Sequence, residues 1–91
     1  MGVTTVIKDY GTEILNAIRE NDLQRLKSIL EKHLKGDRKI QKLFITDIKH
    51  KPTKKFACPL ILAARQADPR IMHYMMQKGT DPNFVHHTIF S

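Results

Sequence analysis

The residues best suited to covalent or metal chemistry are one cysteine and five histidines, and none of them falls in a catalytic motif. Cys58 comes directly before Pro59, a residue suited to the first position of a helix. A helix N-terminus lowers the pKa of a thiol, so Cys58 could in principle act as a nucleophile. The sequence has no glycine-rich phosphate loop, G-x-S-x-G elbow or H-E-x-x-H pair, and we expect no enzymatic activity.

The histidines are His33, His50, His73, His86 and His87. His86 and His87 are adjacent and offer two ring nitrogens, but a zinc site needs roughly three or four ligands with supporting spacing. We therefore expect neither a metal ion nor another cofactor.

Length and composition indicate one domain, residues 1–91, with a small core. No apolar stretch approaches the length of a membrane span, and the N-terminus lacks the apolar region of a signal peptide. A single cysteine rules out an internal disulfide and fits a reducing compartment. We expect the protein in the cytoplasm or the nucleus.

The segment Cys58–Asn83 predicts two short helices in an antiparallel hairpin. Pro59 marks the start of the first helix, and Asp68 followed by Pro69 marks the start of the second. Gly79 falls where a helix must end in a left-handed residue.

This segment resembles an ankyrin repeat. Cys58-Pro59-Leu60-Ile61 stands for the family's T-P-L-H, Ala63 and Ala64 for its paired alanines, and Gly79-Thr80-Asp81-Pro82-Asn83 for its closing G-A-D-x-N. The resemblance implies an all-α fold of helix-turn-helix repeats, a fragment of an α-solenoid, that binds proteins without catalysis. It also places Cys58 at the threonine position, as a capping residue, and Met72, Met75 and Met76 at packing positions.

A weaker copy of the pattern occupies Thr12–Glu31. Thr12 matches the family's threonine, Ala17 its first alanine, and Asn21 its left-handed turn residue, while Asp22 is able to cap the following helix. The apolar stripe of that helix is Leu23, Leu26, Ile29, Leu30 and Leu34, and Gly36 is expected to end it. The family's hairpin glycine is replaced by Tyr10 in this copy and by Phe56 in the later one.

The predicted organisation is repeat 1 at about residues 9–36, a basic insert at about 37–53, repeat 2 at about 54–83 and a possible third repeat beginning in 84–91. Family repeats recur about every 33 residues, whereas Thr12 and Cys58 are 46 residues apart. Two repeats are fewer than the roughly three that bury a continuous core. The chain could continue as a longer array, form a homodimer through the incomplete stack, or cover the exposed face with the insert.

The formal excess of positive charge lies between Lys32 and Ala57. This stretch holds nine basic and two acidic residues, and the rest of the chain holds seven of each. A basic cluster attracts acidic protein segments, nucleic acid or anionic lipid, with a strength that falls as salt rises. A solvated loop that only keeps the protein dissolved is an equal alternative. Five apolar residues argue against pure disorder, and we expect them to fill extra core: Ile40, Leu43, Phe44, Ile45 and Ile48.

The resemblance also implies where a partner binds: at the hairpin before the T-P-L-H position and just after the paired alanines. In repeat 2 these are Lys54, Lys55, Ala57, Arg65 and Gln66, and in repeat 1 Lys8, Asp9, Gly11, Arg19 and Glu20. The insert adds Lys39, Lys42 and Lys51. We expect an acidic segment of another protein as the partner, and the chain as the N-terminal part of a larger adaptor. The alternative is a basic module for nucleic acid or anionic membranes, for which Phe44 and Phe56 alone make a poor stacking platform.

Overall fold

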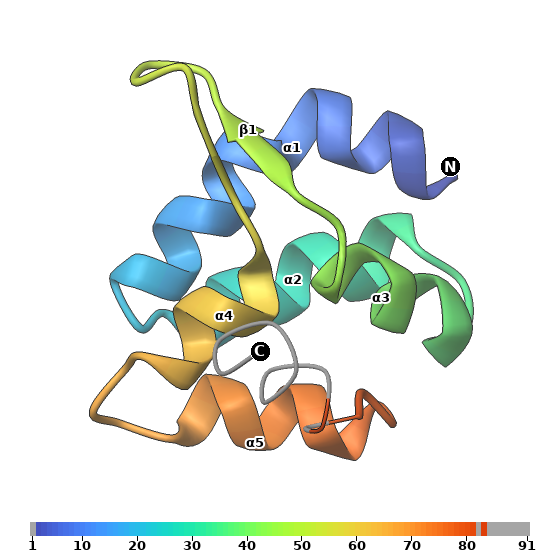
Figure 1. Cartoon of the computed structure of the whole chain (residues 1–91). Coiled ribbons are helices and arrows are strands. Elements are labelled where there is room, and N and C mark those ends of the chain that lie inside the picture. Colours follow the sequence, from blue (N-terminus) through green and yellow to red (C-terminus); the bar gives the residue numbers. More distant parts are fainter. Residues whose placement is uncertain (1, 82, 84–91) are drawn as a thin grey trace.

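The computed structural model of the chain describes residues 2–81 and 83. Within these residues it contains five helices and one two-stranded antiparallel sheet (Figure 1). In chain order the elements are α1 (Val3–Arg19), α2 (Leu23–His33), α3 (Asp37–Phe44), β1 (Ile48–His50), β2 (Lys55–Ala57), α4 (Pro59–Ala64) and α5 (Arg70–Gln77). A mostly helical chain is thus confirmed, while the β-hairpin lies outside the all-α prediction. The possible third repeat at 84–91, with His86 and His87, lies outside the described residues.

Several local signals act as predicted. Asp22 caps α2, because its Oδ1 accepts a hydrogen bond from the backbone N–H of Arg25 at 3.1 Å. Asn21 and Gly79 have left-handed φ values of 54° and 91°, and each follows the end of a helix. Asp68 Oδ1 accepts from the backbone N–H of Arg70, 3.0 Å away at the start of α5. The helical hairpins α1–α2 and α4–α5 therefore form as expected.

The start of the predicted first repeat differs from the structure. Helix α1 runs without interruption from Val3 to Arg19, so Lys8, Asp9 and Gly11 lie inside a helix and not in a turn. No proline or capping pair interrupts this stretch, and its apolar residues keep helical spacing toward the core. Helix α2 also ends early, at His33, and Gly36 with a φ of 93° leads into α3 instead.

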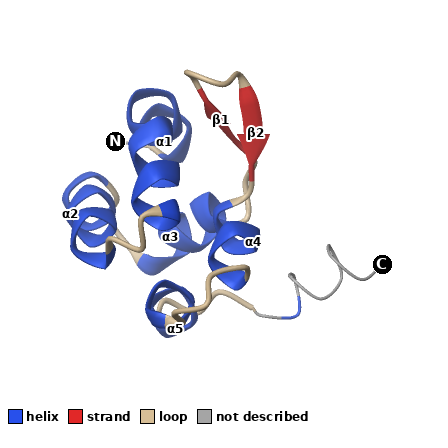
Figure 2. Ribbon diagram, turned by 90° about the vertical axis from the view of Figure 1, so that its left-hand side faces the viewer, coloured by secondary structure: helices blue, strands red, loops and turns tan. Residues whose placement is uncertain are grey.

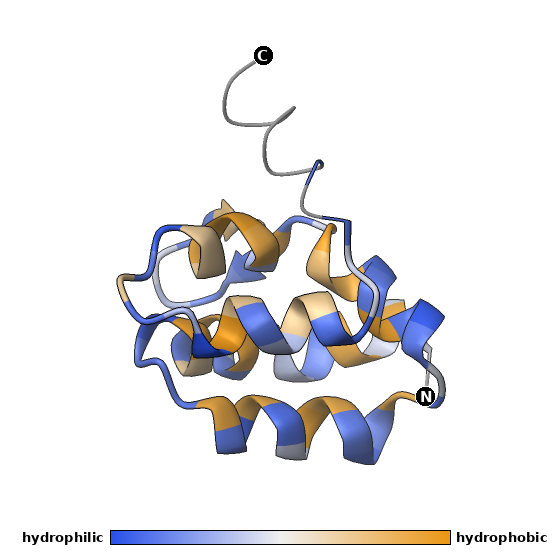
Figure 3. Cartoon of the chain, turned by 90° about the horizontal axis from the view of Figure 1, so that it is seen from below, coloured by the Kyte–Doolittle hydropathy of each residue, from blue (hydrophilic) through white to orange (hydrophobic). Residues whose placement is uncertain are grey.

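Helix α1 is the centre of the fold and contacts α2, α3, α4 and β1. In two perpendicular views the hairpin stands at one end of the molecule and α5 at the other (Figures 1 and 2). Hydrophobic and hydrophilic residues alternate along the helices, as expected where each helix buries one face (Figure 3). The largest fully buried side chains are Val6, Ile14, Leu15, Ile18, Leu26, Leu30, Leu43, Phe44, Ile48, Leu60, Ile71 and Met75.

The apolar residues of the insert do fill core. Ile40, Leu43, Phe44 and Ile48 are all buried, whereas Ile45 remains 42% exposed. Helix α3 is tied to the far end of the chain by Gln41, whose Nε2 donates to the carbonyl of Lys78. The apolar residues of the insert are therefore packed into the core of this fold.

The methionine stripe is buried only in part. Met75 is buried, Met72 is half-buried, and Met76 is 47% exposed. The packing role predicted for Met75 is confirmed, while that of Met76 is wrong within the described residues.

Candidate binding surface

The hairpin formed by β1 and β2 is held firmly against α1. Ile48 packs over Gly11, where an added Cβ would lie 2.6 Å from Ile48 Cγ2. The backbone N–H of Lys51 donates to Thr12 Oγ1 at 3.1 Å. These contacts follow one face of α1, since Gly11 and Thr12 are adjacent and the next anchor lies one turn further on.

That next anchor is a buried histidine. His50 is 8% exposed, and its Nε2 lies 3.0 Å from Asn16 Oδ1 on α1. Its Nδ1 lies 2.8 Å from Thr53 Oγ1 in the hairpin turn. Because an amide oxygen can only accept, Nε2 carries the proton shared with Asn16. His50 thus joins the turn of the hairpin to the central helix, and the hairpin presents its outer face in a fixed orientation.

The outer face of the hairpin combines an aromatic ring with positive charge. In the antiparallel register Lys49 pairs with Phe56, while the flanking pairs Ile48–Ala57 and His50–Lys55 belong to the opposite face. Phe56 is 66% exposed, an unusual position for a large apolar side chain. Lys54 has a left-handed φ of 58° in the turn, whereas Phe56, predicted at the hairpin-turn position, lies in strand β2.

The predicted contact positions are exposed in large part but do not all lie together. Lys51, Lys54 and Lys55 are exposed on the hairpin, next to half-buried Ala57. The hairpin carries four lysines, the fourth being Lys49. None of the four forms a salt bridge with any residue of the described chain. Their charges are therefore directed to solvent or to a partner.

A second group lies where α1 and α4 end, on the same side of Figure 1 as the hairpin tip and below it. Arg19 and Arg65 are exposed there, and Gln66 is half-buried. Glu20 is exposed, but its carboxylate already pairs with Arg25 at 3.2 Å. Helix α1 packs against both α4 and β1, so it connects these helix ends to the hairpin.

Lys39 and Lys42 do not join that face. Both are exposed on α3, which lies at the right of Figure 1, while the hairpin tip lies at the upper left. The positive charge of the insert is thus divided between two elements. Only the hairpin lysines are on the side of the molecule where α1 and α4 end (Figure 1).

Cys58 does not cap α4 as predicted. Its side chain makes no capping hydrogen bond, and Sγ instead donates to the carbonyl of Phe44 at 3.3 Å. Burial raises the pKa of the Cys58 thiol and outweighs the opposing effect of the α4 backbone N–H groups of Ile61 and Leu60. The thiol is 6% exposed and protonated, which is unsuited to nucleophilic attack.

The described histidines have separate environments. His33 stacks on Tyr10 with ring centroids 4.4 Å apart, and His73 is exposed on α5. Across residues 2–81 and 83, no three His, Cys, Asp or Glu side chains gather in a way that could hold a metal ion.

Phe56 belongs to this surface but was not among the predicted contact positions. Lys55-Phe56-Ala57 is too short and has no polar–apolar alternation that would indicate a strand with Phe56 on its outer face.

No protein-family model, curated protein or solved structure matches the chain. The ankyrin-like interpretation therefore stays a prediction from the residues of Thr12–Glu31 and Cys58–Asn83.

Proposed function

We propose that the chain is a non-catalytic protein-binding module of the ankyrin type, which holds an acidic segment of another protein against its basic hairpin. The observation that carries this proposal is Phe56, 66% exposed and opposite Lys49 on a hairpin fixed to α1. Aromatic anchors ringed by polar groups contribute most of the binding energy in many protein interfaces. The function would be that of an N-terminal adaptor part in the cytoplasm or the nucleus.

The unpaired lysines attract an acidic segment and help to orient it on the hairpin. Lys49 lies on the same face as Phe56, and Lys51, Lys54 and Lys55 lie at the tip and edge of the hairpin. None of these lysines forms a salt bridge within the described chain, so a carboxylate-rich segment competes with no internal ion pair for them. Such complementarity raises the association rate and selects against basic partners. Arg65 and Arg19 extend the same positive surface toward the ends of α4 and α1, with Gln66 as a hydrogen-bonding neighbour.

The pairing of helices supports the scaffold part of the proposal. Two helical hairpins, α1–α2 and α4–α5, pack through their first helices, and the β-hairpin comes directly before the Cys58-Pro59-Leu60-Ile61 tetrapeptide. This is the order of elements expected of consecutive repeats that carry a projecting hairpin.

A basic module for RNA or anionic membranes is the alternative. Phe56 among lysines favours it as well, because an aromatic ring can stack on a base or enter a lipid interface. Phe44, the other aromatic residue of the insert, is fully buried and cannot contribute to a stacking platform.

Binding measurements on the full chain separate these functions. The probes are a fluorescein-labelled Asp- and Glu-rich peptide with one tryptophan, poly(U) RNA, and vesicles of phosphatidylcholine and phosphatidylserine, at an ionic strength of about 0.15 M. We expect the peptide to bind and the double variant Lys54→Glu/Lys55→Glu to lose about tenfold in affinity. The matched control is Lys39→Glu/Lys42→Glu, with the same change in net charge on α3.

Equal losses in the two double variants would show that only net charge matters and would contradict a hairpin site. Tighter binding of RNA or vesicles than of the peptide would favour the alternative function. A homodimer through the incomplete repeat stack is a further expectation, and sedimentation analysis of the concentrated chain tests it: a monomer at high concentration contradicts it.

A further inference from the structure

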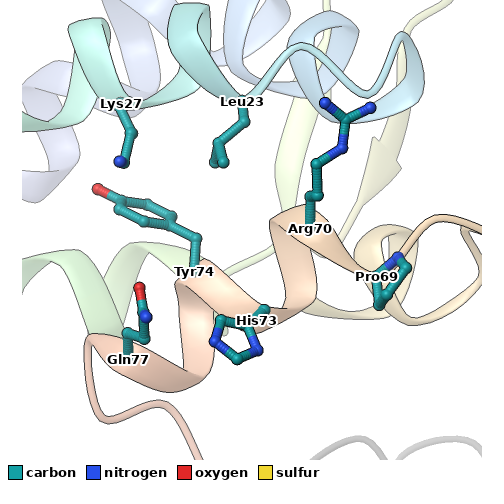
Figure 4. A pocket seen from close by; sticks show the side chains of 7 residues that line it. All are labelled: Leu23, Lys27, Pro69, Arg70, His73, Tyr74 and Gln77. Atoms are coloured by element: carbon teal, nitrogen blue, oxygen red, sulfur yellow. The ribbon is translucent and has the colours of Figure 1, made fainter.

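A groove lies between α2 and α5 (Figure 4). Helix α5 is at the end of the molecule opposite the hairpin (Figure 1). The volume of the groove is about 310 Å³. Leu23 and Lys27 reach into it from α2, and Tyr74 and Arg70 rise toward them from α5, with His73 and Pro69 at the near rim (Figure 4). None of these residues belongs to the hairpin surface described above.

The floor of the groove is apolar and fixed. Tyr74 is 3% exposed, and its ring meets Phe44 edge to face at a centroid distance of 6.3 Å. Its hydroxyl donates to Glu31 Oε1 at 3.3 Å, which holds the ring from the other side. Leu23 and Pro69 add aliphatic surface. The Tyr74 ring is therefore fixed and almost wholly covered, and a side chain that enters the groove meets the aliphatic surface of Leu23 and Pro69 beside it.

One positive charge at the groove is available to a ligand. Lys27 Nζ lies 5.5 Å from the centroid of the Tyr74 ring and forms no salt bridge within the described chain. Arg70, by contrast, is paired with Asp68 at 2.8 Å. No acidic side chain lines the groove. An anionic group bound beside Lys27 thus replaces no internal partner.

We propose that this groove binds an acidic peptide segment in which an aromatic or branched apolar side chain neighbours a carboxylate. The apolar side chain lies against Leu23 and Pro69, beside the buried Tyr74, and the carboxylate pairs with Lys27. The volume is at the lower end of the roughly 300–1,000 Å³ of small-molecule sites, which fits one inserted side chain of a peptide better than a whole ligand. The exposed rim of Arg70 and His73 is then covered by the peptide backbone.

The test is an NMR titration of the isotope-labelled full chain with the capped peptide Gly-Glu-Phe-Glu-Gly. We expect amide shifts confined to α2, α5 and the loop before α5. The Lys27→Met variant keeps the aliphatic stem and should bind about two- to fivefold more weakly. Lys32→Met, which removes an exposed lysine from the same helix away from the groove, should bind as the unchanged chain does.

A second pair of variants tests the effect of charge in the groove without a substitution at Lys27. Gln77→Glu adds a negative charge to the groove, and Ser28→Glu adds the same charge at an exposed position of α2 that does not line it. Only Gln77→Glu should weaken binding of the peptide.

The proposal is overturned if the shifts map to the hairpin, or if Gly-Lys-Phe-Lys-Gly binds equally well. The proposal is also overturned if Lys27→Met and Gln77→Glu both bind the peptide as tightly as the unchanged chain does. Free 4-phenylbutyrate that binds more tightly than the peptide would assign the groove to small organic acids instead. Lys54→Glu/Lys55→Glu should leave this titration unchanged, so failure of the hairpin function and failure of the groove are distinguishable.

Discussion

Gly11 and Ile48 are in such close contact that the hairpin can lie on α1 only because residue 11 has no side chain. A Cβ built on Gly11 would be 2.6 Å from Ile48 Cγ2, well inside van der Waals contact. Cγ2 is attached directly to the branched Cβ of Ile48, so it cannot move away without the strand. A glycine in the middle of a helix weakens that helix, and here the cost is compensated by the docked hairpin.

We predict that Gly11→Ala destabilises the protein, against the usual effect of this substitution in a helix. The gain in helix propensity of about 1 kcal/mol is outweighed by overpacking, for a net loss of about 1–2 kcal/mol. Denaturant unfolding of the variant measures it. Thr5→Ala, an exposed change in the same helix, is the control, and its unfolding free energy should stay within about 0.5 kcal/mol of the unchanged chain.

The same clash should disappear in an Ile48→Ala background. There Gly11→Ala should cost nothing further or stabilise slightly, since Cγ2 has been removed. Additive losses in the double variant would show that the two residues do not interact and that the hairpin lies elsewhere.

The hydrogen bonds of His50 give a second prediction about the hairpin. His50→Ala removes a buried ring that bridges Asn16 and Thr53, and we expect a loss of about 1–3 kcal/mol in unfolding free energy. Amide hydrogen exchange should quicken in β1 and β2 while α4 and α5 keep their protection, because they do not depend on this bridge. Thr4→Ala, an exposed change near the start of α1, is the control. Uniform loss of protection across the chain would contradict a local anchoring role.

Much of the helical part of this fold could be predicted because its signals are local. Asp22, Asn21 and Gly79 act on their own backbone or on residues a turn away, so their types alone indicate the helix ends. The burial of Ile40, Leu43 and Phe44 also followed from helical spacing within one short segment.

The hairpin could not be predicted in the same way. Its strands are three residues each, too short for a clear alternating pattern, and their position depends on Gly11, Thr12 and Asn16 more than thirty residues earlier. For the same reason Gly11 was assigned to a turn and the role of Phe56 was missed. Lys54 and Lys55 were expected at the surface, but the separation of Lys39 and Lys42 from them is a product of tertiary packing.

Cys58 gives a prediction about pH. Burial raises its pKa in the folded state above the usual value of 9.0, so the folded protein binds this proton more tightly than the unfolded chain does. The stabilisation from this proton is complete below pH 9 and is lost as pH rises. We expect the unfolding free energy to fall above that pH with a slope of up to about 1.4 kcal/mol per pH unit from this group.

Denaturant unfolding between pH 8 and pH 10, compared with Cys58→Ala, isolates the contribution of the thiol. The variant should lose that part of the slope. Iodoacetamide should also label native Cys58 far more slowly than the denatured chain. Equal labelling rates, or an unchanged slope in the variant, would mean that the thiol is exposed.

Phe56 separates stability from binding more sharply than any other residue of the hairpin. Because its side chain is 66% exposed, Phe56→Ala should change the unfolding free energy by no more than about 0.5 kcal/mol. The same change should lower the affinity for the Asp- and Glu-rich peptide about tenfold, as truncation of an aromatic anchor does. Ile45→Ala is the matched control, since Ile45 is also a large exposed apolar residue of the insert but lies off the hairpin. If both variants bind the peptide as the unchanged chain does, the aromatic ring is incidental and only charge attracts the partner.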